Sequence, residues 1–202
     1  MAAKIVSSLS SFNGVAFLLA LLLCISTNAQ ISMADSTSKT YKNYLQKACN
    51  STTYPQLCFN SLSSYTSTIK TNDLKLCNTA LTVTLKAASN TSSLVKASSK
   101  QKGLSKSEAG VIKDCVDEMG DSIDELKQSL KALGSLKGSD IEFQIATVQT
   151  WVSAAITDED TCTEGFDEMN ITGEVMIKIR KSIVNVGRLT SNALALINKL
   201  SY

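Results

Sequence analysis

The stretch VIKDCVDEMGDSIDELKQSLKAL, residues 111–133, decides the fold class of this 202-residue chain. Its apolar side chains recur every three or four residues, which places them on one face of an α-helix. They are Ile112, Cys115, Met119, Ile123, Leu126, Leu130 and Leu133. The stretch contains no proline, so nothing in it stops a helix. It therefore predicts one long amphipathic helix that must pack its apolar face against other helices.

Three more segments carry such a stripe. It is clear in residues 141–156 and in residues 175–200, and it is weaker in residues 74–95, where the apolar residues lie seven apart. The residues of these stripes are Ile141, Ile145, Val148, Val152 and Ala155; Val175, Ile179, Ile183, Val186, Ala193, Leu196 and Leu200; and Leu74, Leu81, Ala88 and Val95.

The four stripes predict helices over roughly 73–100, 105–133, 139–167 and 173–200, joined by short loops that contain glycine. Short loops make neighbouring helices antiparallel, so we expect an all-α fold with an up-down four-helix bundle. Residues 36–70 predict a helical hairpin before the bundle, turning near Tyr54 and Pro55. Pro55 is the only proline in the chain, and no segment has the alternating pattern of a strand.

The first 29 residues have the layout of a secretory signal peptide. Lys4 precedes an apolar run from Val15 to Ile25 that is too short to span a bilayer, and Thr27-Asn28-Ala29 fits a cleavage site. We expect cleavage after Ala29, with Ala34 as the alternative. Residues 30–202 are then expected to form one extracellular domain, with no membrane contact. In that compartment Asn50, Asn90 and Asn170 are possible N-glycosylation sites.

Five cysteines remain once Cys24 leaves with the signal peptide. In an antiparallel hairpin that turns near residue 136, Cys115 faces position 157, about a turn and a half from Cys162, so we pair these two. Cys49 and Cys58 flank the N-terminal turn and pair by proximity. Cys77 would face about position 129, far from any other cysteine, and is expected to be a free thiol.

Charge is unevenly distributed along the chain. Residues 30–104 contain nine Lys and two acids, residues 105–168 contain five Lys and fifteen acids, and residues 169–202 contain five basic residues and one acid. The acidic block is either a solvated face or a surface that attracts a basic partner. Nucleic acid is not an expected partner, because the basic residues are scattered Lys with few aromatics among them.

Catalysis is not expected, and neither are a metal or a cofactor. The chain has no histidine, so a Ser-His-Asp or Cys-His pair is impossible, and Cys77 has no evident activating group. The consecutive acids at 158–160 point in different directions on a helix and make a poor metal site. A secreted helical carrier of an apolar ligand remains an alternative.

Four segments resemble the plant invertase and pectin methylesterase inhibitor family. They are CNSTTYPQLCFNSL (49–62), DCVDEMGDSIDELKQSL (114–130), WVSAAITDEDTCTEGF (151–166) and LTSNALALINKL (189–200). The resemblance implies a four-helix bundle with an N-terminal helical hairpin and two disulfides. The four cysteines that the family shares fall on Cys49, Cys58, Cys115 and Cys162, in agreement with the pairing above.

The family has an invertase branch and a pectin methylesterase branch. Invertase inhibitors resemble one another in a Pro-Lys-Phe stretch, which this chain cannot contain because its only proline is Pro55. TDEDTCTEGF (157–166) looks like the pectin methylesterase branch, including the pro-regions of full esterases. The sequence stops at Tyr202, so a free inhibitor is expected, with acid invertase as the alternative target. Met119 departs from many relatives, which have an aromatic residue there.

The resemblance also implies a binding surface. In this family the polar faces of the two central helices cover the active-site cleft of the esterase. The residues of this chain at the family's contact positions are Glu118, Asp121, Asp124, Thr161 and Glu164. We therefore expect Cys162 to tie the helices together while the carboxylates around it face a partner. The expected complex is reversible and 1:1 with pectin methylesterase, and the free chain is expected to be a monomer.

Overall fold

The computed structural model describes residues 36–168 and 173–200. Four long helices follow one another: α4 (Asp73–Ser98), α5 (Lys106–Leu133), α6 (Ile141–Glu168) and α7 (Glu174–Ile197). No strand occurs among the described residues. The all-α fold class is confirmed, and the helix ends lie within about two or three residues of the predicted ones.

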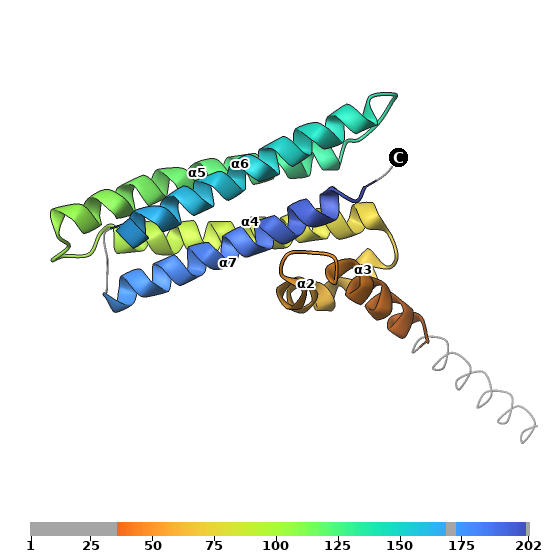
Figure 1. The fold of residues 1–202 in the computed structure, drawn as a ribbon, viewed down its shortest axis with the longest axis horizontal. Helices are drawn as coiled ribbons and strands as arrows, with labels where there is room; N and C mark the ends of the chain where they lie inside the picture. The colour runs from red at the N-terminus through yellow and green to blue at the C-terminus, as the bar shows by residue number, and fades with distance from the viewer. Residues whose placement is uncertain (1–35, 169–172, 201–202) are drawn as a thin grey trace, which may run out of the picture. The chain divides into compact units, whose positions relative to one another are not determined.

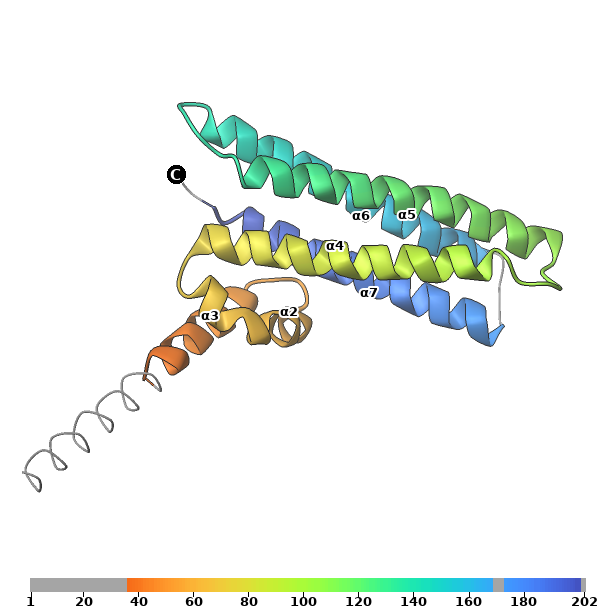
Figure 2. The ribbon, with the colours of Figure 1, turned by 180° about the vertical axis from the view of Figure 1, so that it is seen from behind.

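The four helices form an up-down bundle (Figures 1 and 2). Each long helix packs on the one that follows it, and α7 also packs back on α4, which closes the bundle.

Two polar caps define where α4 and α5 begin. The side chain of Asn72 accepts from Lys75 N, and Ser105 forms a reciprocal capping box with Glu108. The turn after α5 needs Gly138, because its φ of +82° is costly for residues with a Cβ.

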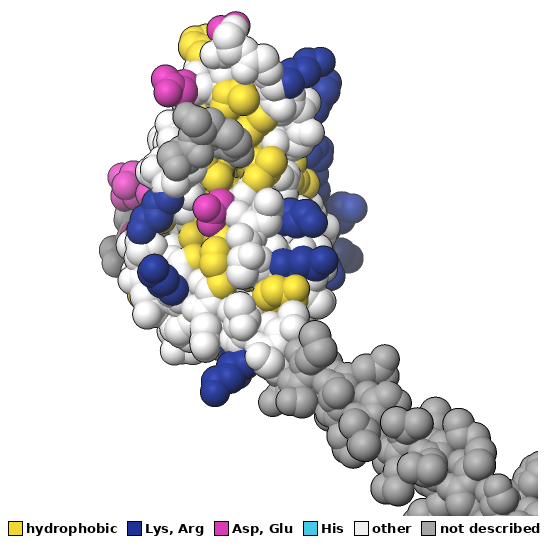
Figure 3. Space-filling model, turned by 90° about the vertical axis from the view of Figure 1, so that its right-hand side faces the viewer, with side chains coloured by type: hydrophobic (Ala, Val, Ile, Leu, Met, Phe, Trp, Pro, Cys, Tyr) yellow, Lys and Arg dark blue, Asp and Glu magenta, His cyan; other side chains and the backbone are white. Residues whose placement is uncertain are grey.

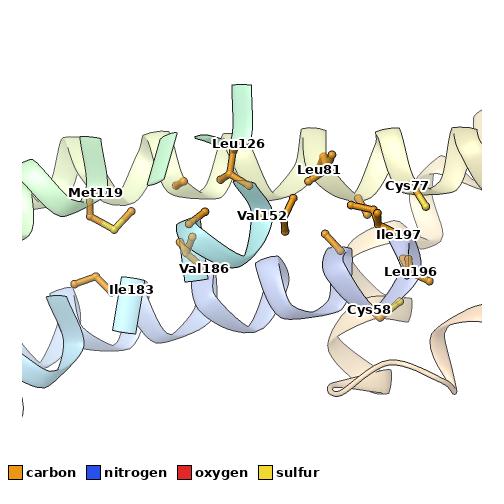
Figure 4. Packing of buried hydrophobic residues seen from close by; sticks show 14 of the residues in the cluster. Cys58, Cys77, Leu81, Met119, Leu126, Val152, Ile183, Val186, Leu196 and Ile197 are labelled. Atoms are coloured by element: carbon orange, nitrogen blue, oxygen red, sulfur yellow. The ribbon is translucent and has the colours of Figure 1, made fainter. Parts of the chain in front are cut away.

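The core runs along the bundle axis and takes residues from all four helices (Figure 4). Fully buried examples are Leu81 of α4, Leu126 of α5, Val152 of α6 and Ile183 of α7. One predicted core residue is wrong. Val175 in the first turn of α7 is 37% exposed, whereas the next residue, Met176, is buried, so the apolar stripe begins one residue later than predicted.

The N-terminal hairpin predicted over residues 36–70 consists of one helical segment before the turn and three short helical pieces after it. Residues 36–49 are helical, and after the turn come α2 (Pro55–Leu62), the 3-10 turn η1 (Ser63–Tyr65) and α3 (Thr66–Ile69). A disulfide joins Cys49 to Cys58, with 5.5 Å between their Cα atoms. It ties the last turn of the first helical segment to α2.

Helix α7 holds the turn of this hairpin. Tyr54 N donates to Asn192 Oδ1 at 2.8 Å, and Asn192 Nδ2 donates to Tyr54 O at 3.0 Å. The Arg188 guanidinium lies 5.3 Å from the centre of the Tyr54 ring. Asn192 is buried, and its side chain satisfies both backbone groups of Tyr54. These contacts fix the position of the turn against α7.

The predicted signal peptide (1–29), both cleavage positions and the possible glycosylation site Asn170 lie outside the described residues. The other two possible glycosylation sites, Asn50 and Asn90, have exposed side chains. Within 36–168 and 173–200, no helix is long and apolar enough to cross a membrane.

Candidate partner-binding face on helices α5 and α6

A disulfide between Cys115 of α5 and Cys162 of α6 fixes the spacing of these two helices. Their Cα atoms are 4.8 Å apart, and both side chains are buried. Cys77 of α4 is a free, buried thiol, and burial, followed by the negative charge of Asp73, raises its pKa to about 12. Cys77 is therefore an unreactive core residue.

A groove of about 320 Å³ lies over this disulfide, between α5 and α6. Gly165 of α6 faces Val111 of α5, and an added Cβ would lie 3.5 Å from the Val111 side chain, in ordinary van der Waals contact. Carboxylates line both walls of the groove: Asp114 and Glu118 on α5, and Glu164 and Glu168 on α6. A groove with four carboxylates attracts a cationic or hydrogen-bond-donating partner.

The structure brings three of the five predicted contact residues together. Glu118, Thr161 and Glu164 all line the groove. Asp121 is exposed one turn further along α5, outside the groove. Asp124 also lies outside, and its carboxylate pairs with Lys127 of its own helix at 2.9 Å. That surface pair already supplies a cation to Asp124, so Asp124 offers less to a partner than Glu118 does.

The acidic face holds protons more tightly than isolated carboxylates do. Partial burial, and then the negative charges of Asp158 and Asp121, raise the pKa of Glu118. Glu125 of α5 and Asp158 of α6 interact electrostatically across the helix pair, and each has one buried carboxylate oxygen without a hydrogen-bond partner. Burial and the charge of Asp158 raise the pKa of Glu125 to about 7. The net charge of this face therefore changes between mildly acidic and neutral pH.

Glu159 corrects the expectation that the carboxylates around Cys162 all face outward. Its side chain is only 1% exposed, and it points into the bundle between α5, α6 and α7. The hydroxyls of Ser122 and Thr190 lie 2.8 and 3.0 Å from Glu159 Oε1. Burial raises the pKa of Glu159 to about 8, against the opposing effect of these two hydroxyls. The neighbouring Asp160 is exposed, as expected.

The sequence did contain a signal for Glu159. The α6 stripe Val148, Val152, Ala155 continues with the same spacing to residue 159 and then to Cys162. Ser122 and Thr190 likewise occupy buried positions on the inner faces of α5 and α7. Three polar residues at core positions of three different helices indicate a buried polar cluster.

Charge is unevenly distributed on the surface as well. Figure 3 shows many Lys and Arg side chains along one edge of the molecule and most acidic side chains toward the other edge, where some Lys and Arg side chains also lie. Among the described residues, no cluster of three or more carboxylate or cysteine side chains is arranged to hold a metal ion.

Comparison with known proteins identifies the family of this chain. Residues 43–196 match the family model described as plant invertase/pectin methylesterase inhibitor. The chain is 43% identical over 191 residues to pectinesterase inhibitor 4 of Arabidopsis thaliana, covering 91% of this chain and 96% of that protein. It is 38% identical over 174 residues to the 21 kDa protein of Daucus carota, covering 85% and 90%.

The fold is also similar to a solved structure. A mutant form of a pectin methylesterase inhibitor from Arabidopsis superposes with a TM-score of 0.60 and 24% sequence identity, covering 76% of this chain and 94% of that one. The family is one of enzyme inhibitors and not of enzymes. With a matching family model over most of its length, close relatives and the same bundle, the chain belongs to the plant invertase/pectin methylesterase inhibitor family.

Proposed function

We propose that this protein is a secreted inhibitor of pectin methylesterase that acts in the plant cell wall. In this proposal the α5–α6 face covers the active-site cleft of the esterase in a reversible 1:1 complex, and so limits the de-methylesterification of pectin. The observation that carries the proposal is the groove over Cys115–Cys162, whose walls include Glu118, Thr161 and Glu164.

Three further observations support this target. Relatives of this chain at about 40% identity are named pectinesterase inhibitors. The chain has no Pro-Lys-Phe stretch, which the family resemblance associates with invertase inhibitors. The disulfide also joins the two walls of the groove covalently, and a preorganised surface loses less entropy on binding.

The apolar-carrier alternative gains nothing from the groove, because carboxylates line it and an apolar ligand would have to strip them of water. The cavity beside Cys77 is also small, at about 60 Å³, and it includes Asp73 and Lys199 in its lining.

The test is a titration of the purified mature chain into a plant pectin methylesterase and, separately, into an acid invertase. We expect esterase activity to fall with a 1:1 end point and to recover on dilution, while invertase activity stays unchanged. Inhibition of the invertase, with no effect on several esterases, would contradict the proposal and support the other branch of the family.

A further inference from the structure

Glu159 makes a hydrogen-bonded bridge between three helices, which we call the Glu159 bridge: Glu159 of α6, Ser122 of α5 and Thr190 of α7. All three side chains are at most 1% exposed. The second carboxyl oxygen, Oε2, is buried and has no hydrogen-bond partner. On α7 it lies beside Gly187, where an added Cβ would be 3.7 Å from this oxygen.

The hydrogens of this cluster can be counted. Thr190 Oγ1 lies 3.0 Å from Glu159 Oε1 and also 3.0 Å from the carbonyl oxygen of Val186. That carbonyl can only accept, and the threonine hydroxyl has one hydrogen to donate. When Thr190 donates to Val186, the contact with Glu159 needs a hydrogen from the carboxyl group itself. A neutral carboxylic acid with its proton on Oε1 therefore satisfies both contacts of that oxygen, while Oε2 still has no donor.

A negative charge at this position would have little compensation. On its own helix Glu159 is flanked by Asp158 and Asp160, which both disfavour a further negative charge. On α5 the nearest charged side chains in sequence to Ser122 are Asp121 and Asp124, and on α7 the nearest to Thr190 is Arg188. Arg188 is exposed and lies over the Tyr54 ring. The two ion pairs of the described residues, Lys127–Asp124 and Arg180–Asp167, do not include Glu159.

We infer that Glu159 is a buried, protonated carboxylic acid that makes the cohesion of α5, α6 and α7 depend on pH. With its proton, the Glu159 bridge joins the three helices. Loss of the proton leaves a charged carboxylate among apolar side chains, with one oxygen that no donor reaches, and loosens the bundle beside the α5–α6 groove. This inference concerns the free protein, so it does not depend on which enzyme the chain inhibits.

The direction of the pH effect follows from the two states of Glu159. Its pKa is about 8 in the folded chain, compared with an ordinary value of 4.5. The stabilising contribution of the neutral acid is complete below about pH 4.5 and is lost as pH rises through about 8. In the ideal case of one proton, the unfolding constant rises about tenfold per pH unit between these limits.

The experiment measures chemical unfolding of the whole mature chain from pH 5 to pH 9, followed by the fluorescence of Trp151, the only tryptophan. The comparison variant is Glu159→Gln, which keeps the shape and removes the ionisation. We expect the ratio of the wild-type unfolding constant to that of the variant to rise about several hundredfold between pH 5 and pH 8. The matched control, Asp160→Asn, removes the same charge from the exposed neighbour and should change the ratio less than about threefold.

A second measurement avoids any dependence on the folding of the variant. The ¹³C chemical shift of the Glu159 carboxyl in the wild-type chain should stay that of a protonated acid until above pH 7. A shift midpoint below about pH 5.5 would overturn the inference. Parallel pH profiles of the wild type and Glu159→Gln would overturn it as well, because the ionisation of Glu159 would then have no effect on cohesion.

Discussion

The two halves of the bundle, α5 with α6 and α4 with α7, have similar cores, but their surfaces carry charge of opposite sign. Helices α5 and α6 together contain fourteen acidic and four basic residues, whereas α4 and α7 contain two acidic and seven basic residues. Both halves bury aliphatic side chains on the same axis, as Leu81 and Leu126 illustrate. The asymmetry therefore lies in the solvent-facing positions, which the core does not constrain.

The buried polar groups of α4 also differ from those of the α5–α6 pair. In α4, Thr84 and Ser98 donate to carbonyls of their own helix, Ala80 O and Leu94 O, so they hold nothing across the bundle. In α5 and α6, the buried polar group Glu159 is bonded to other helices, and a disulfide joins the pair. The comparison indicates that the α5–α6 pair is held in a defined arrangement by directional contacts, as a binding surface requires.

Breaking the Cys115–Cys162 bond should have the largest effect on this comparison. Replacing Cys162 with Ser should lower the free energy of unfolding by roughly 2 to 5 kcal/mol, because the unfolded chain loses a long covalent loop. Esterase inhibition should weaken too, since the groove walls could then separate. Urea unfolding and inhibition assays measure the two effects.

The control for this experiment is Cys77→Ala, which removes a thiol of the basic half and leaves both bridges intact. Peptide mapping without reduction should give Cys49 with Cys58 and Cys115 with Cys162, and it should find Cys77 free. A bridge that includes Cys77 would mean that the register of α4 against its neighbours is wrong.

The sequence was sufficient for the architecture because a stripe of period 3.6 and a short loop leave few arrangements open. The same argument placed Cys115 opposite the region of Cys162. The groove could not be predicted, since it depends on the side-chain positions around Gly165 and on how far α5 lies from α6. Asp124 was predicted as a contact because it is acidic and outward, but its pairing with Lys127 depends on rotamers that spacing does not specify.

The smallest effect on stability is expected on the outer surface of α5. Changing Asp121 and Asp124 together to Asn should alter the free energy of unfolding by less than about 0.5 kcal/mol per residue, because both are exposed. Inhibition should weaken only modestly if these residues lie at the rim of the complex, where salt screens them. Melting temperature and inhibition at two salt concentrations provide the measurement. A lowered melting temperature with unchanged inhibition would assign these acids to the fold.

The central claim is that inhibition resides in the groove between α5 and α6, and it is tested most directly with Glu118 and Glu164. The variant Glu118→Gln/Glu164→Gln removes one charge from each wall of the groove, and the matched variant Asp140→Asn/Glu142→Gln removes two charges near the other end of the same helix pair. The measurement is the inhibition constant of each variant against one pectin methylesterase. If each groove acid makes a desolvated contact, we expect inhibition by the groove variant to weaken by about 2 kcal/mol or more per residue, which is at least about thirtyfold each, with the matched variant near the wild type. Equal inhibition by the groove variant and the wild type would contradict the claim and would place the binding surface elsewhere on the bundle.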